Sequence, residues 1–465
     1  MTTAVPPRPT VCVIGAGISG LTTSKILSDY AIPFDTFESG DRVGGNWAFK
    51  NSNGHSSAYR SLHIDTSAEG LRFKDFAIST SYPDFPHHSQ VQQYLEDYSA
   101  AFDLKRHIRF NTSVKHAERL DGGGWRIDTS DGETRHYDVL VVGNGHHWDP
   151  RFPQFPGTFD GETMHSHHYI DPEEPLHLRG KRILVVGIGN SASDIVSELS
   201  QQSNRNRVFL STRSGAWVVP KYMLGKPVDQ LISTFPRLPM KPQRYLARAL
   251  PRLLSGDMTH YGLPQPNHHF LEAHPTQSSE LLVRLGSGDA VAKPNVRALE
   301  GNRVRFVDDS VEDIDVIIWA TGYNITFPFF DEDFLSAPDN RIDLFKRILV
   351  PGIDDLMLVG FGQAIPTLFP FVECQASLVA RYLAGTYRPP AVPKMKAAIA
   401  ADHERYLGHM HDSARHTQQL DYHVYADDMV RRELPAGRKR ARGQGPVALA
   451  GRAATQIGKE RVDAH

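Results

Sequence analysis

Two glycine-rich turns in the sequence have the spacing that holds the phosphates of a dinucleotide. Each fits the pattern G-x-G-x-x-G/A, and the second begins 172 residues after the first (187 − 15). The first glycine permits a tight turn, the second lets a pyrophosphate approach the backbone, and the third lets a helix pack closely on its strand. The N-terminus of that helix then faces the phosphates. The residues predicted to bind in this way are Gly15, Ala16, Gly17, Ile18, Ser19 and Gly20 in the first turn, and Gly187, Gly189, Asn190, Ser191, Ala192, Ser193 and Asp194 in the second.

The residues that follow each turn predict which dinucleotide binds. Glu38 lies 23 residues after Gly15 (38 − 15) at the end of a predicted strand, where a carboxylate accepts the ribose hydroxyls of FAD or NAD. The corresponding strand of the second copy ends in Ser211-Thr212-Arg213, and a guanidinium there can bind the 2′-phosphate of NADP. Because two nicotinamides would have nothing to exchange, the pair predicts hydride transfer from NADPH to FAD.

Each turn needs a strand before it and a helix after it, and the hydrophobic pattern supplies this order twice. The predicted elements are a strand at 10–14, a helix at 19–30 and a strand at 34–38, then a strand at 183–186, a helix at 191–200 and a strand at 208–210. Two further buried strands are predicted at 138–142 and 316–320, and Ser89 is predicted to cap an amphipathic helix over 91–102. The sequence therefore predicts an α/β fold with two Rossmann-like units.

Composition excludes several other classes of protein. The 465 residues include 51 Lys and Arg against 53 Asp and Glu, so no nucleic-acid partner is expected. With only two cysteines, Cys12 and Cys374, a disulfide framework, a cysteine zinc site and the dithiol of a flavin disulfide reductase are all excluded. No metal site is predicted, because the histidines at 165, 167 and 168 have no cluster of cysteines or carboxylates beside them.

No signal peptide and no apolar stretch of roughly 18 residues is found, so we expect a soluble, cytoplasmic protein without a membrane partner. Adjacent histidines, such as His87-His88 and His146-His147, are predicted to lie in turns or at the surface. No motif determines the oligomeric state, for which a homodimer is one candidate.

The segment before the second turn carries a more specific pattern. Phe159-x-Gly161-x-x-x-His165-x-x-x-Tyr169 resembles the identifying sequence of the flavin-containing monooxygenases, which are class B flavoprotein monooxygenases. Baeyer–Villiger monooxygenases are similar but carry Trp where Tyr169 stands. Two further motifs resemble the family's flavin-binding loop and its ATGY sequence, and they add cofactor-binding candidates: Gly45, Asn46 and Trp47 in the first, and Ala320, Thr321, Gly322 and Tyr323 in the second.

The resemblance implies a reaction. NADPH reduces FAD, the reduced flavin takes up O2 as a C4a-hydroperoxyflavin, and a nucleophilic nitrogen or sulfur of a small amine or sulfide receives one oxygen atom. NADP stays bound and shields the intermediate, which requires a pocket from which water is excluded. The resemblance thus implies an oxidoreductase of the N,N-dimethylaniline monooxygenase type. Baeyer–Villiger oxygenation of a ketone remains an alternative, as does a non-enzymatic redox sensor.

One position departs from the family pattern. Residues 59–67 resemble a family segment in which an asparagine contacts flavin and NADP, and this chain has Asp65 there, after Ile64. An amide both donates and accepts hydrogen bonds, whereas an ionised carboxylate only accepts. We hypothesise that Asp65 acts catalytically as a neutral donor, or else makes the enzyme an uncoupled NADPH oxidase. Both Ile64 and Asp65 are expected at the cofactor.

The motif order predicts an FAD domain interrupted by an NADP domain. The FAD domain is expected at residues 1–168 and 311–434, and the NADP domain at 169–310. Residues 435–465 contain seven Lys and Arg with few apolar residues, which predicts a disordered basic tail.

Overall fold

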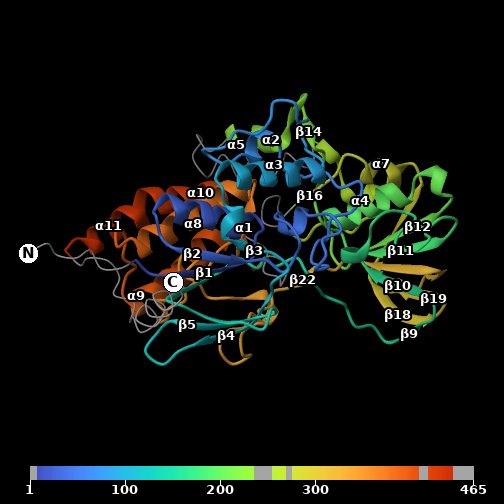
Figure 1. The fold of residues 1–465 in the computed structure, drawn as a ribbon. Helices are drawn as coiled ribbons and strands as arrows, with labels where there is room; N and C mark the ends of the chain where they lie inside the picture. The colour runs from blue at the N-terminus through green and yellow to red at the C-terminus, as the bar shows by residue number, and fades with distance from the viewer. Residues whose placement is uncertain (1–7, 235–253, 269–274, 408–416, 444–465) are drawn as a thin grey trace, which may run out of the picture.

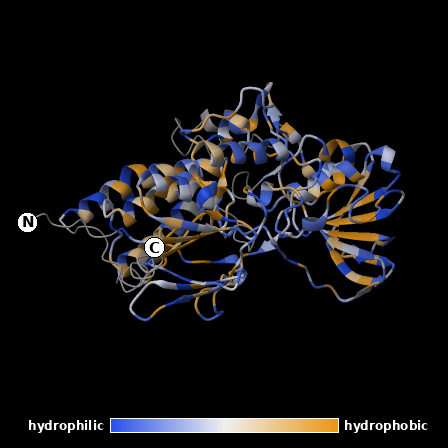
Figure 2. Ribbon diagram, viewed as in Figure 1, coloured by the Kyte–Doolittle hydropathy of each residue, from blue (hydrophilic) through white to orange (hydrophobic). Residues whose placement is uncertain are grey.

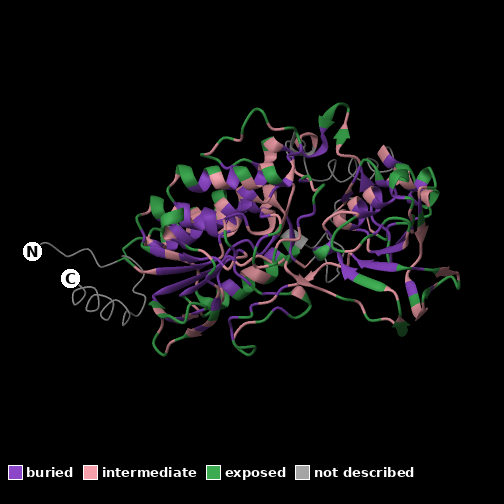
Figure 3. Cartoon of the chain, turned by 45° about the vertical axis from the view of Figure 1, so that its right-hand side comes forward, coloured by how far each residue is buried: buried purple, intermediate pink, exposed green. Residues whose placement is uncertain are grey.

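The computed structural model describes residues 8–234, 254–268, 275–407 and 417–443. Two five-stranded parallel sheets form its centre and lie beside each other in Figure 1. Strongly apolar strands build both sheets, as the hydropathy colours of Figure 2 show for the second sheet on the right. Strands buried along their whole length are typical of parallel sheets with both faces covered, and Figure 3 shows them buried here.

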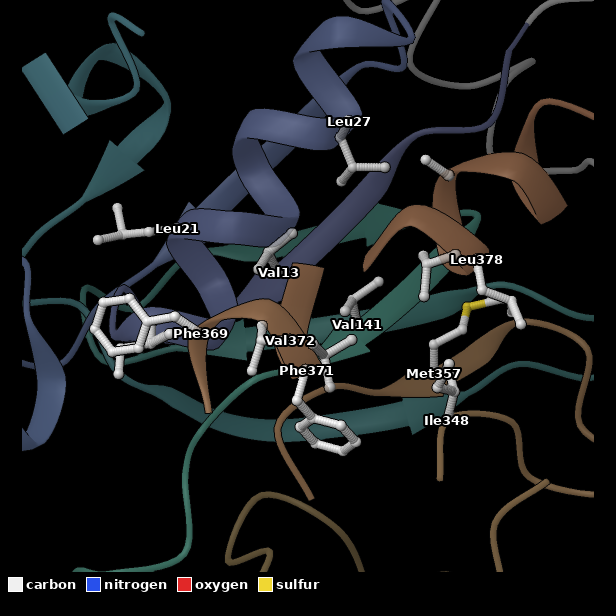
Figure 4. Packing of buried hydrophobic residues seen from close by; sticks show 14 of the residues in the cluster. Val13, Leu21, Leu27, Val141, Ile348, Met357, Phe369, Phe371, Val372 and Leu378 are labelled. Carbon is white, nitrogen blue, oxygen red and sulfur yellow. The ribbon is translucent and has the colours of Figure 1, made fainter. Parts of the chain in front are cut away.

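The first sheet has the strand order β23-β7-β1-β2-β3. One face is covered by α1 (Ile18–Asp29) and α8 (Phe369–Leu383), and Leu21, Leu378 and Val141 belong to the core between them (Figure 4). An antiparallel sheet, β4-β5-β6, contributes Trp125 to a second core on the opposite face. The strands of the first sheet are β1 (Val11–Ile14), β2 (Phe34–Phe37), β3 (Ile108–Arg109), β7 (Val139–Val142) and β23 (Leu356–Leu358).

The second sheet has the strand order β10-β21-β11-β12-β17. Helix α4 (Asn190–Leu199) follows β11 and contacts α7 (Leu281–Gly286). The strands are β10 (Glu162–His165), β11 (Arg182–Val186), β12 (Arg207–Ser211), β17 (Ala290–Lys293) and β21 (Val316–Trp319). Because β10 and β21 lie outside residues 169–310, the predicted boundaries of the second domain are wrong at both ends. Hydrophobic runs locate strands but do not say to which sheet each strand belongs.

Further strands and helices lie outside the two five-stranded sheets and the helices named above. The strands are β4 (Val114–Arg119), β5 (Trp125–Thr129), β6 (Thr134–Tyr137), β8 (Asp149–Pro150), β9 (Gly157–Phe159), β13 (Val218–Val219), β14 (Tyr222–Met223), β15 (Lys226–Pro227), β16 (Thr276–Gln277), β18 (Val296–Gly301), β19 (Arg303–Phe306), β20 (Val311–Asp313), β22 (Tyr323–Asn324), β24 (Gln363–Ile365) and β25 (Gln419–Asp421). The helices are α2 (Ala68–Leu71), α3 (His88–Ala101), α5 (Val228–Thr234), α9 (Val392–Leu407), α10 (Tyr422–Asp428) and α11 (Leu434–Ala441).

Two local predictions are wrong for identifiable reasons. Helix α3 is capped by His87 and not by Ser89, because the His87 ring accepts from the Ser89 N–H while the Gln90 side chain accepts from the His87 N–H. The predicted disordered tail begins too early, since residues 434–441 form α11. There Gly437 lies against the ring of Tyr387, a contact that composition does not reveal. Residues 444–465 lie outside the described residues.

Candidate active site

The two glycine turns have equivalent geometry. In the first, the Gly15 N–H donates to Phe37 O at 2.8 Å, and in the second the Gly187 N–H donates to Ser211 O at 2.9 Å. Both glycines have positive φ, of 95° and 134°. A Cβ at Gly15 would lie 2.7 Å from Gly143 O, and one at Gly187 would lie 2.2 Å from Ala320 O. Both turns therefore need glycine, as the motif predicts.

The third position of the pattern also behaves as predicted. A Cβ on Gly20 would lie 1.7 Å from Gly15 O, so only glycine lets α1 pack this closely on its turn. Ala192 is fully buried at the same place in the second unit. Gly17 and Gly189, at the second position, are the N-caps of α1 and α4, and neither has a side chain to cap the helix. The N–H groups at both helix starts are thus open to a phosphate.

Glu38 is buried and holds the first turn together. Its carboxylate accepts from the Ala16 N–H at 2.7 Å and from the Gly40 N–H at 2.6 Å. Burial raises the pKa of Glu38, and these two backbone hydrogen bonds oppose that effect. Each carboxylate oxygen has a second lone pair, so the residue still fits the ribose hydroxyls of FAD.

The equivalence of the two turns shows which residue of the second unit corresponds to Glu38. Since Glu38 follows Phe37 and Thr212 follows Ser211, Thr212 corresponds to Glu38. Its hydroxyl donates to Ser214 O at 2.6 Å, and the Ser211 hydroxyl donates to Pro294 O at 2.7 Å. Arg213 is the exposed residue next along the chain. A neutral residue followed by an exposed guanidinium fits the 2′-phosphate of NADP.

The loop expected to bind flavin lies directly on the first turn. The Gly44 N–H donates to Ala16 O at 3.0 Å, and a short helical turn follows over Gly45–Trp47. The Asn46 side chain accepts from the N–H and the hydroxyl of Ser57, at 2.9 and 2.8 Å. Trp47 is half-buried and packs on the core of the first sheet. These contacts hold the loop and leave part of the indole accessible.

Asp65 connects the two units. Its Oδ2 accepts from Asn190 Nδ2 at 2.5 Å, and its Oδ1 lies 3.1 Å from the ammonium of Lys221. Both contacts suit a carboxylate that accepts, and the role of Asp65 as a neutral donor stays a prediction. Ile64 beside it is buried. Sequence reasoning missed Lys221, because no spacing relates it to Asp65, 156 residues earlier (221 − 65).

Other predicted residues face the protein instead of open space. Ile18 and Ser193 are buried within α1 and α4, and the Asp194 carboxylate accepts a hydrogen bond from the Tyr59 hydroxyl. Ser19 and Ser191 are half-buried at the helix starts. For Ser193 and Asp194, direct contact with a cofactor stays a prediction.

The ATGY sequence directly follows β21 of the second sheet. Its Ala320 N–H donates to Val186 O, the Thr321 hydroxyl donates to Arg151 O, and the Arg151 N–H donates to Gly322 O. Short strands β8 and β22 pair at this point, where the chain passes between the two sheets. Ala320 thus corresponds in the second unit to Gly143 in the first.

Three histidine rings lie close to the ring of Tyr323. The ring centroids of His147, His165 and His167 lie 5.4, 5.3 and 5.7 Å from that of Tyr323. His165 and His167 are buried, and burial lowers the pKa of His165 to about 4. Of the adjacent histidines predicted to lie in turns or at the surface, His147 is exposed at a bend, whereas His88 is buried. Within the described ranges, His, Cys, Asp and Glu side chains nowhere gather in a group of three that could hold a metal ion.

No helix in the described part of the chain is both long enough and apolar enough to cross a bilayer.

Proteins similar to this chain are found among solved structures and among sequence relatives. Among solved structures, S-allyl-L-cysteine S-oxygenase from Allium sativum is similar, with a TM-score of 0.67 at 22% identity over 98% of this chain and 99% of the other. A cyclohexanone monooxygenase bound to ε-caprolactone gives a TM-score of 0.70 at 18% identity, over 94% and 99% of the two chains. At these identities the likeness establishes the fold, which is that of two-domain α/β flavin monooxygenases.

The sequence relatives are more similar. Flavin-containing monooxygenase 5 of Rattus norvegicus is 34% identical over 436 residues, covering 89% of this chain and 80% of the relative. Dimethylaniline monooxygenase (N-oxide-forming) 2 of the same species is 34% identical over 442 residues, covering 90% and 82%. The family described as flavin-binding monooxygenase-like matches residues 8–434. The chain therefore belongs to this family and is a flavin-dependent monooxygenase.

Proposed function

We propose that the protein is an FAD- and NADPH-dependent enzyme that transfers one atom of O2 to a nucleophilic nitrogen or sulfur of a small molecule. The observation that supports this most is the bond between Asn190 and Asp65, because it joins the start of the second dinucleotide helix to the segment expected at the flavin. Two dinucleotides bound at these turns would face a common region. The relatives named for N-oxide formation and S-oxygenation support the substrate class.

The chain's own residues have defined tasks in this proposal. Glu38 and the α1 N-terminus bind FAD, while the α4 N-terminus and Arg213 bind NADPH. Bound FAD supplies the oxygen chemistry, through a C4a-hydroperoxyflavin formed after reduction. The protein must orient the two cofactors and exclude water, because water and stray protons release hydrogen peroxide.

Stopped-flow spectroscopy tests the proposal. The FAD-loaded protein is reduced with NADPH without oxygen and is then mixed with oxygenated buffer. We expect a long-lived absorbance of the oxygen adduct, which decays faster when an amine or a sulfide is added. Direct return to oxidised flavin, with no intermediate and no oxygenated product, would reject the proposal.

Ketone oxygenation is distinguished by its products. Tyr169, which the related Baeyer–Villiger pattern replaces with Trp, is fully buried and donates to Glu198 at 2.8 Å. Incubation with a methyl sulfide and, separately, a cyclic ketone should give sulfoxide and no lactone. Lactone at a comparable rate would favour the Baeyer–Villiger alternative.

A further inference from the structure

One face of α4 contacts residues 59–65, the segment expected at the flavin, over three successive turns. We call residues 59–65 the flavin-side segment. Asn190, Asp194 and Glu198 are spaced four residues apart, so their side chains lie on the same face of the helix. Each of the three has a hydrogen-bond partner in residues 59–65. Asn190 donates to Asp65, Tyr59 donates to Asp194, and Ser61 donates to Glu198 at 3.0 Å. We call this set of contacts the α4 joint.

The α4 joint brings acids together with few cations. Burial, and then the nearby charge of Asp65, raises the pKa of Asp194 to about 7, and the exposed Glu280 acts in the same direction. The hydrogen bond from Tyr59 and the charge of Lys221 oppose this rise. Lys221 itself is in an ion pair with Asp65. Ionisation of Asp194 therefore adds a second negative charge beside Asp65, whose own charge is already paired with Lys221.

The location of the joint connects it to the reaction. Asn190 is the first residue of α4, where the proposed NADPH pyrophosphate binds, and its side-chain oxygen also accepts from the Gln277 N–H at 3.0 Å. The segment 59–65 includes Ile64, which is expected at the flavin. Any change in the fit of α4 against this segment would therefore move one dinucleotide site relative to the other.

We propose that Asp194 is a positioning residue, whose protonated side chain lets α4 dock on residues 59–65 and so sets the distance between the two dinucleotide sites. The inference rests on the proposed function for its catalytic consequence, but the docking itself does not. Above neutral pH, repulsion between Asp194 and Asp65 loosens the joint. NADPH then reduces the flavin more slowly.

Hydrogen–deuterium exchange of the purified protein measures the docking without any reaction. After correction for the intrinsic pH dependence of exchange, peptides covering 59–65 and 190–199 should exchange faster above about pH 7, by up to roughly tenfold per pH unit. Asp194→Asn should remove this dependence. Glu198→Gln, one turn further along α4, should raise exchange at every pH and keep the slope.

Two neighbouring substitutions separate the effect of the like charge from that of the cation, which a merely structural role would not do. Asp65→Asn removes the charge that repels ionised Asp194, so the faster exchange above neutral pH should disappear. Lys221→Met removes the cation that favours ionised Asp194, so the pKa of Asp194 rises and the faster exchange begins at higher pH. Persistence of the pH dependence in Asp65→Asn or in Asp194→Asn, or an earlier onset in Lys221→Met, would overturn the inference. If Asp194→Asn does not fold, the other two variants decide alone.

The anaerobic rate of flavin reduction by NADPH is the second measurement. We expect this rate to fall by roughly tenfold between pH 7.5 and 8.5 in the wild type, and by much less in Asp194→Asn. If NADPH reduces the flavin at no pH, the proposed function fails and the exchange result still decides the docking. If reduction occurs with the same pH profile in both proteins, the inference fails and the proposed function stands.

Discussion

Asn190 donates a hydrogen bond to Asp65 at 2.5 Å across 125 positions of sequence, and this bond ties the second dinucleotide helix to the flavin-side segment. The ammonium of Lys221 lies 3.1 Å from the other oxygen of the same carboxylate. An asparagine at position 65 could accept the first bond and would not need the cation. The carboxylate and Lys221 therefore form a matched pair in this chain.

Asp65→Asn tests whether the carboxylate makes turnover leaky. Removing negative charge near the reacting flavin should lower the hydrogen peroxide released per NADPH consumed by several-fold. Peroxide and oxygenated product are measured together during steady turnover with a sulfide. Asp84→Asn, which alters an exposed carboxylate bonded to Tyr222, serves as the control. Identical peroxide yields in wild type and Asp65→Asn would contradict the hypothesis.

Glu38→Ala should destabilise the first turn even in the FAD-free protein. It leaves the Ala16 and Gly40 N–H groups without their acceptor in a buried site, which costs about 3 kcal/mol. Urea unfolding of FAD-free protein measures this loss, and the FAD content of the purified variant should fall as well. The exposed neighbour provides a control, since Asp41→Ala should change stability by only about 0.5 kcal/mol or less. Equal stability of the two variants would contradict the role of Glu38.

Arg213→Ala should reduce the preference for NADPH over NADH. Loss of a charge-assisted contact to the 2′-phosphate should raise the KM for NADPH by about 10- to 100-fold and affect kcat less. Arg207 lies at the opposite end of β12, so Arg207→Ala should leave the preference unchanged. Steady-state reduction assays with both nucleotides provide the ratio. An unaltered preference for NADPH over NADH in Arg213→Ala would show that Arg213 does not bind the 2′-phosphate.

The glycine turns and the strands beside them could be predicted because their requirements are local. Positive φ at Gly15 and the lack of space for a Cβ at Gly20 are fixed by a pattern of six residues, and the strand runs follow from burial on both faces. The same locality explains why the position of Glu38, directly after β2, could be predicted from its spacing alone.

The remaining features depend on contacts between distant segments. Assignment of β21 to the second sheet requires knowing that it pairs with β11, where the paired residues Ile183 and Val316 are 133 positions apart (316 − 183). Lys221 and Tyr59 become part of the site only through tertiary contacts. Burial of His165 likewise follows from its packing against Tyr323. Sequence periodicity contains no signal for these neighbours.

His165 should make the protein sensitive to acid. Its pKa falls from 6.5 to about 4 in the folded protein because the ring is buried, and its Nδ1 accepts from the His167 N–H at 3.1 Å. Between those values the unfolded chain binds a proton that the folded chain does not. Stability is therefore lost as pH falls below about 6.5, by about 3 kcal/mol at pH 4 from this residue.

Urea unfolding from pH 7 to pH 4 measures this effect. His165→Asn retains an acceptor near the position of Nδ1 and cannot take up the proton, so its free energy of unfolding should fall less steeply with acid than that of the wild type. His168, three residues along, is exposed, and His168→Asn should keep the wild-type slope. Comparing slopes removes any constant cost of the smaller side chain. Parallel slopes for His165→Asn and wild type would show that the folded protein binds this proton as readily as the unfolded chain does.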